Sequence, residues 1–140
     1  MLYSNAMQTF LPYSDFGLSA KCLDYRRLGK QRVEAETIYR TILHGSGWRH
    51  HPAVKMWTGF ESALLDYRDE MIREWIRRGY RNNMPFGSAK KGRRKIDYPW
   101  WLGDEILHSS HRSNLLRKDP VFYGQYGWVE PDNLPYFWPI

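Results

Sequence analysis

The chain has 140 residues, which is enough for one domain with a single hydrophobic core. Hydrophobic residues make up 42% of it and aromatic residues 16%, which excludes a disordered chain despite a mean hydropathy of -0.69. Lys and Arg number 21 against 15 Asp and Glu, for a formal net charge of +6. This balance favours a polyanionic partner such as nucleic acid, and the many Trp and Tyr residues offer flat surfaces on which bases could stack.

Several classes of protein do not fit the sequence. The single Cys22 can form neither an internal disulfide nor a multi-cysteine zinc site, and we expect it to be a buried thiol. No apolar run approaches the roughly 18 residues of a membrane span, and no signal-peptide pattern opens the chain. We therefore expect a cytoplasmic monomer with no membrane segment, metal or organic cofactor.

Two methionines stand near the start of the chain. Residues 1–6, MLYSNA, end in Ser-Asn-Ala before Met7 and resemble the remnant of an expression tag. We predict that residues 1–6 are such a remnant or a short extension, and that residues 7–140 form the single domain. The segment after Met7 should be extended and broken at Pro12.

The first predicted helix spans residues 19–43, with Ser19 as its N-cap and Gly29 as a weak point or kink. On a helix, four polar residues at i, i+3, i+4 and i+7 share one face. A face of cations, an amide and a carboxylate suits a phosphate backbone held beside an acid. The alternative is a solvated face with ion pairs. The four residues are Arg27, Lys30, Gln31 and Glu34.

The second predicted helix spans residues 52–78, begins with Pro52 in its first turn and stops at Gly79. Apolar residues recur at steps of three and four, which predicts one continuous buried stripe without a chemical role. The stripe consists of Val54, Trp57, Phe60, Leu64, Tyr67, Met71 and Trp75.

Residues 80–101 show no clear periodicity and predict a long irregular loop. Five cations lie within six positions of it and repel one another, so an anionic partner would order them; the alternative is a mobile, solubilising loop. These cations are Lys90, Lys91, Arg93, Arg94 and Lys95.

The third predicted helix spans residues 104–118, with Asp104 as cap and with Ile106, Leu107, Leu115 and Leu116 facing inward. His108 and His111 share a face, but no matched carboxylate accompanies them, so a binding or structural role is favoured over a metal site. The tail from Pro120 onward is rich in aromatics and proline and should pack over the helices. The expected fold is mainly α: a single domain of about three helices with long irregular loops and an aromatic, Pro-rich C-terminal coil.

Three stretches resemble the pyrimidine-dimer DNA glycosylases, the small phage-type enzymes called dimer-specific endonuclease V. LDYRRLGKQR is similar to the family's first-helix block, in which a Tyr-Arg pair precedes the catalytic Glu. VKMWTGFESALLDYRDEMIREWIRRGY is similar to the long middle helix, and SHRSNLLRKDPVFYGQYG to the third helix and its aromatic coil. The HPAVKMW opening of the middle helix is also similar to a bacterial branch of the family. The resemblance covers most of residues 7–127.

The resemblance implies the endonuclease V fold and a DNA glycosylase with AP-lyase activity on damaged or modified pyrimidines in duplex DNA. In that mechanism the N-terminal α-amine attacks the sugar C1′, and a Schiff base permits strand cleavage by β-elimination. By this resemblance the amine would be that of Met7, provided that the chain begins there. Lys30 or Lys55 could replace it if the pKa of its amine were lowered.

The resemblance also implies an acid/base carboxylate, but Arg27 stands where the family carries its Glu. Glu34 is the nearest replacement on the same face as Arg27, and Glu36 is the second choice. Asp24 lies one turn from Arg27 in the opposite direction along the chain. The residues expected to contact DNA are Arg26, Arg27, Lys30, Arg32, His50, His51, Lys90, Lys91, Arg93, Arg94 and Arg112.

Two other functions remain open from the sequence. A non-catalytic nucleic-acid-binding protein could keep this scaffold after losing the Glu. Hydrolysis or transfer on a small phosphorylated substrate would instead require a closed pocket rather than an open basic groove.

Overall fold

The computed structural model describes residues 7–87, 89 and 95–140. The described chain is mainly helical, and no strand occurs in it. The predicted tag remnant, residues 1–6, lies outside the described residues. No helix of the described part is both long and apolar enough to cross a membrane.

Two helices, α1 (Phe16–Cys22) and α2 (Tyr25–His44), replace the single first helix predicted from the sequence. The predicted Ser19 cap is wrong: Asp15 caps α1 by accepting a hydrogen bond from Leu18 N–H, and Asp24 caps α2 by accepting one from Arg27 N–H. Leu23 between them is extended, with ψ 140°. A second capping aspartate therefore interrupts the predicted helix.

At Gly29, the predicted weak point or kink, α2 continues without a break. The missing side chain serves packing instead. A Cβ atom on Gly29 would lie 2.8 Å from Cζ3 of Trp75, so glycine allows the Trp75 ring to lie directly against α2.

The second predicted helix is divided into α3 (Pro52–Lys55) and α4 (Glu61–Arg77). Gly59, at φ +91°, lies in the break. The apolar stripe still forms core as predicted, because Val54, Trp57 and Leu64 are buried and the rest of the stripe is buried or partly buried. The stop after α4 is confirmed by Gly79, whose φ is +92°.

The third long helix, α5 (Glu105–Lys118), begins at the predicted cap Asp104. Leu107 and Leu115 are buried as expected, but the inward assignment of Ile106 is wrong, since its side chain is 65% exposed. The tail begins with α6 (Pro120–Tyr123) and the 3₁₀ turn η2 (Gly124–Tyr126), then continues as coil.

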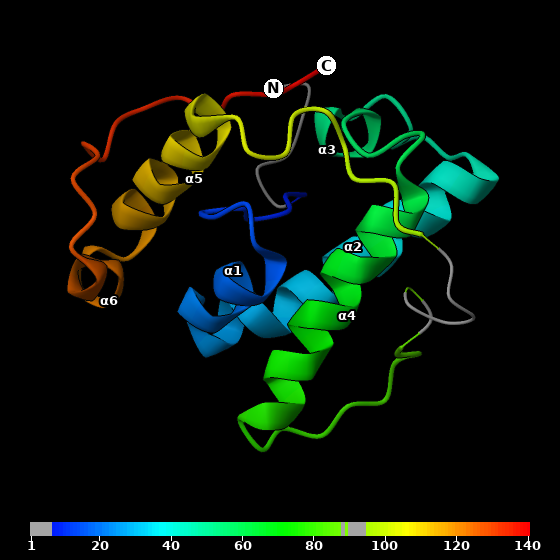
Figure 1. Ribbon diagram of the computed structural model, residues 1–140, viewed down its shortest axis with the longest axis horizontal. Coiled ribbons are helices and arrows are strands. Elements are labelled where there is room, and N and C mark those ends of the chain that lie inside the picture. The colour runs from blue at the N-terminus through cyan, green and yellow to red at the C-terminus, as the bar shows by residue number, and fades with distance from the viewer. Residues whose placement is uncertain (1–6, 88, 90–94) are drawn as a thin grey trace.

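The helices form two groups with the N-terminal segment between them (Figure 1). The most extensive helix–helix contact joins α2 to α4, and α1 also packs on α4. On the other side α5 and α6 pack together, and the C-terminal coil passes along α5. Asn114 of α5 holds that coil by donating a hydrogen bond to Leu134 O. Residues 7–12 therefore have α2 on one side and α5 on the other.

Candidate nucleic-acid interface

A buried glutamine in the middle of α2 fixes the N-terminal segment against this helix. Phe10 N–H donates to Gln31 Oε1 over 2.9 Å, and Gln31 Nε2 donates to Gln8 O over 2.9 Å. The hydroxyl of Tyr67 on α4 lies 2.6 Å from Gln31 Oε1 and 2.8 Å from Phe10 O. Such a satisfied buried network fixes one position for the segment. It sets residues 7–12 beside the polar face that the sequence predicted.

On the α5 side, two histidines hold the same segment. Leu11 N–H donates to His111 Nδ1 over 2.8 Å, and His108 Nδ1–H donates to Leu11 O over 2.8 Å. Gly103 N–H donates to His108 Nε2, which fixes this tautomer. Both histidines are buried, and burial is the largest cause that lowers the pKa of each, to about 3 for His111. Their role is structural, one of the two roles that the sequence favoured over a metal site. Within the described residues no group of His, Cys, Asp and Glu could hold a metal ion.

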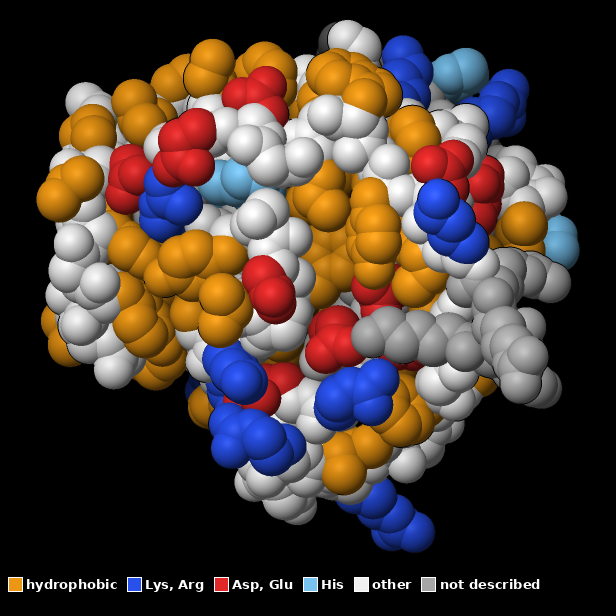
Figure 2. Space-filling view, viewed as in Figure 1, with side chains coloured by type: hydrophobic (Ala, Val, Ile, Leu, Met, Phe, Trp, Pro, Cys, Tyr) orange, Lys and Arg blue, Asp and Glu red, His pale blue; other side chains and the backbone are white. Residues whose placement is uncertain are grey.

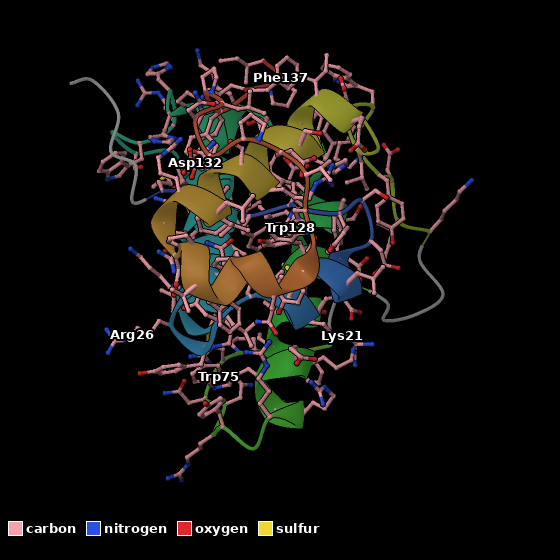
Figure 3. All side chains as sticks on the ribbon, turned by 90° about the vertical axis from the view of Figure 1, so that its left-hand side faces the viewer. Lys21, Arg26, Trp75, Trp128, Asp132 and Phe137 are labelled. Atoms are coloured by element: carbon pink, nitrogen blue, oxygen red, sulfur yellow. The ribbon has the colours of Figure 1, made fainter. Side chains whose placement is uncertain are left out.

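A cleft of about 260 Å³ lies where the N-terminal segment, α2 and the end of α5 meet. All of its charged lining residues are cations, and several of them are exposed to solvent. Arg26, for example, points away from the body of the molecule (Figure 3). The lining residues are Gln8, Phe10, Arg26, Arg27, Lys30, Gln31 and Lys118. An open, cationic cleft of this kind suits a phosphate backbone.

Arg27 is held in the wall of this cleft by the helix cap. Its Nη1 forms an ion pair with Asp24 Oδ1 at 3.1 Å, and the Tyr123 hydroxyl donates to the same carboxylate. Burial would raise the pKa of Asp24, but the hydrogen bonds from Tyr123 and Arg27 and the charge of Arg27 lower it. Asp24 is therefore an ionised anchor that orients the guanidinium of Arg27.

Among the three carboxylates considered for acid/base chemistry, Glu34 differs from the other two. Glu36 accepts hydrogen bonds from Arg40 and Arg68, which outweigh burial and lower its pKa; Asp24 is fixed as described above. Glu34 has no hydrogen bond or ion pair among the described residues, and burial raises its pKa despite the charge of Lys30. A carboxyl group with a raised pKa is suited to proton transfer near neutral pH.

Several residues expected to contact DNA lie away from the cleft. Arg32 turns toward α4, where its guanidinium lies 4.2 Å from the centre of the Trp75 ring and donates to Asn82 Oδ1. Arg112 is half-buried, pairs with Glu105 and Glu130 and donates to Pro12 O. Both side chains have internal partners.

The two histidines before α3 also differ from the expectation of a shared cleft. His51 is buried and caps α3 by accepting a hydrogen bond from Ala53 N–H. His50 is exposed, and it does not line the cleft described above. The expected phosphate contacts Lys90, Lys91, Arg93 and Arg94 lie outside the described residues.

One lining residue, Lys118, was not singled out from the sequence, where it only marked the end of the third helix. The Arg117-Lys118 pair directly before the aromatic coil was the available signal. Its approach to α2 depends on packing between helices far apart in the chain.

A larger hollow, of about 410 Å³, lies beside α1 and α4 but carries the wrong charge for a polyanion. Among the described residues, the charged ones that line it are Asp15, Asp66 and Glu70, all of them acidic. The face shown in Figure 2 has carboxylates near its middle, with Lys and Arg side chains both above and below them. Coulombic attraction thus favours the cationic cleft as the nucleic-acid site.

Comparison with known sequences identifies the family of this chain. Residues 7–88, more than half of the chain, match the family model for pyrimidine dimer DNA glycosylases. Searches of curated proteins and of solved structures found no match at a significant level. The matched range contains the N-terminal segment, all of α2 and the α4 partner of Gln31. The chain therefore belongs to the pyrimidine dimer DNA glycosylase family.

Proposed function

We propose that this protein is a DNA glycosylase with AP-lyase activity that acts on damaged or modified pyrimidines in duplex DNA. The observation that carries the proposal is the cationic cleft, which lies beside the N-terminal segment and one turn from Glu34 and has no carboxylate among the described residues of its lining. Arg26, Arg27 and Lys30 would bind the phosphates on either side of the damaged base. Such phosphate contacts position the duplex without reading its sequence.

The chemistry requires a primary amine and a proton-transfer group beside the same sugar. A protein that begins at Met7 has a free α-amine next to Gln8, whose side chain lines the cleft. An α-amine with a pKa near 8 has a useful neutral fraction at physiological pH. It would attack C1′ as the base departs, and the resulting Schiff base would allow β-elimination of the 3′-phosphate.

Glu34 is the proposed acid/base group of this reaction. Burial raises its pKa, which makes it a better proton donor to the departing base than the paired carboxylates, and its ionised form would stabilise positive charge on the sugar. Glu34 follows Gln31 by three positions and so lies on the same side of α2 as the residue that holds the N-terminal segment.

Borohydride trapping tests the proposal. A protein that begins at Met7 is incubated with a duplex containing a pyrimidine dimer or an abasic site and then reduced. We expect a covalent adduct and strand cleavage. Glu34→Gln should bind the duplex equally well but release the damaged base about 10²–10⁴-fold more slowly.

Binding without any adduct, across several lesion types, would contradict the enzyme and support a non-catalytic DNA-binding protein on the same scaffold. The small-substrate alternative is not favoured, because the cleft is open and three of its cations, Arg26, Lys30 and Lys118, are exposed.

A further inference from the structure

The cleft contains a second lysine that the proposed mechanism does not use. Lys118 is the last residue of α5, and its side chain reaches the same cavity as Lys30 and Arg27 on α2. The residue remains accessible to solvent. An amine at this position faces the space where the cations of α2 would hold the phosphates of a bound strand.

The surroundings of Lys118 lower the pKa of its amine. Partial burial of the amine is the largest cause that lowers its pKa, and Arg27, Arg117 and Lys30 lower it further. The charged groups that act on Lys118 in the described part of the chain are thus all cations, from both α2 and α5. A neutral amine has the free electron pair that a nucleophile requires, and a desolvated lysine beside other cations is a known way to obtain one.

The chain of 140 residues also raises the question of which amine can react. In a protein that carries residues 1–6, the backbone nitrogen of Met7 is part of the peptide bond with Ala6 and cannot form a Schiff base. We propose that the ε-amine of Lys118 is a nucleophile of this cleft, forming a Schiff base with the C1′ aldehyde of an abasic deoxyribose. The inference rests on the proposed function, since it assumes that the cleft binds DNA.

The step balances without a further reagent. The electron pair of the neutral amine forms the bond between Nζ and C1′. The C1′–oxygen bond breaks, and the oxygen leaves as water with one proton from the amine and one from solvent. The product is a protonated imine, which one molecule of water hydrolyses back to the amine and the aldehyde. The cations of α2 hold the phosphates on either side of the sugar during this exchange.

The test uses the 140-residue chain and a duplex with one abasic site, reduced with borohydride and digested for peptide mapping by mass spectrometry. We expect the adduct on Lys118. Lys118→Arg keeps the positive charge but not the nucleophile, so it should bind the duplex within about twofold of the parent and give at least about tenfold less adduct. The matched control is Lys21→Arg, an exposed lysine of α1 outside the cleft lining, which should leave the yield unchanged.

The outcomes separate this inference from the proposed function. An adduct on Met1 or Lys30, or an unchanged yield with Lys118→Arg, overturns the role of Lys118 but leaves the glycosylase proposal intact. If only a protein that begins at Met7 forms an adduct, the role of Lys118 is likewise wrong and the glycosylase proposal stands. If neither form of the protein gives an adduct, both proposals are wrong.

Discussion

Single side chains decide what the cationic cleft can do. Asp24 holds Arg27, and Glu36 accepts hydrogen bonds from Arg40 and Arg68, so these two carboxylates have structural roles. The carboxyl of Glu34 is left with a raised pKa. The sequence could rank these acids only by their distance along the helix from Arg27. Their hydrogen-bond partners separate them more sharply, because an ionised, paired carboxylate is a poor proton donor.

At the same scale, His111 predicts how stability depends on pH. Burial lowers its pKa to about 3, below the 6.5 of an exposed histidine, so the unfolded chain binds the proton more tightly than the folded one. This contribution to stability is fully present above pH 6.5 and is lost as the pH falls toward 3, by up to about 1.4 kcal/mol per pH unit. The lowered pKa of His108 acts in the same direction.

We therefore expect His111→Asn to reduce the loss of stability between pH 7 and pH 5, as measured by urea unfolding. An asparagine amide oxygen can accept the hydrogen bond from Leu11 N–H but does not titrate. His44→Asn, at an exposed position, is the control and should follow the parent protein. Equal slopes for the parent and His111→Asn would show that the buried imidazole does not control acid stability.

At the scale of the helix, α2 depends on one close approach. Glycine inside a helix costs about 1 kcal/mol relative to alanine, so Gly29→Ala would ordinarily stabilise the protein. Here the new Cβ would lie 2.8 and 2.9 Å from two carbon atoms of the Trp75 ring. That ring is held between Arg32 and Tyr80, and its Nε1–H donates to Arg81 O, so it cannot yield freely.

Gly29→Ala should accordingly lower the free energy of unfolding by about 1–3 kcal/mol in urea titrations. The matched control is Gly124→Ala, at φ -62° and with no neighbour within 4 Å of its Cβ position, which should change stability little. In a protein that already carries Trp75→Leu, the substitution Gly29→Ala should cost less stability than it does in the parent protein. Additive effects of the two substitutions would refute the steric explanation.

At the scale of the whole molecule, three separate segments bring cations and polar groups to one cleft. Such a surface predicts DNA binding that weakens steeply with salt, because each phosphate contact releases counterions. Removing one cation should reduce the slope of log K against log salt by about 1, whatever the sequence of the duplex.

We expect this reduction for Arg26→Ala and for Lys30→Ala in anisotropy titrations at several salt concentrations. Arg40→Ala, an exposed arginine of the same helix that pairs with Glu36 and does not line the cleft, is the matched control. A slope that changes equally in all three variants would mean that DNA binds elsewhere on the protein.

The sequence by itself determined the local features of this protein. Capping and turn residues located the first and third long helices, and periodicity identified the buried stripe of the middle one. The i, i+3, i+4, i+7 spacing placed Arg27, Lys30, Gln31 and Glu34 on one face, because helix geometry is a property of neighbouring residues. The order and spacing of the three motifs predicted the family, and the match to the family model over residues 7–88 confirms this prediction. The breaks at Leu23 and Gly59 were missed, although capping aspartates and glycine are also local signals.

Only the tertiary structure decided how the surface of α2 is used. It turned Arg32 toward Trp75, buried Gln31 as the partner of the N-terminal segment and brought Lys118 from α5 to the opposite wall. These outcomes depend on burial and on hydrogen bonds between residues far apart in the chain, whose energies no local pattern contains. The charge of the face therefore follows from the sequence, whereas the cleft that the face helps to form exists only in the folded protein.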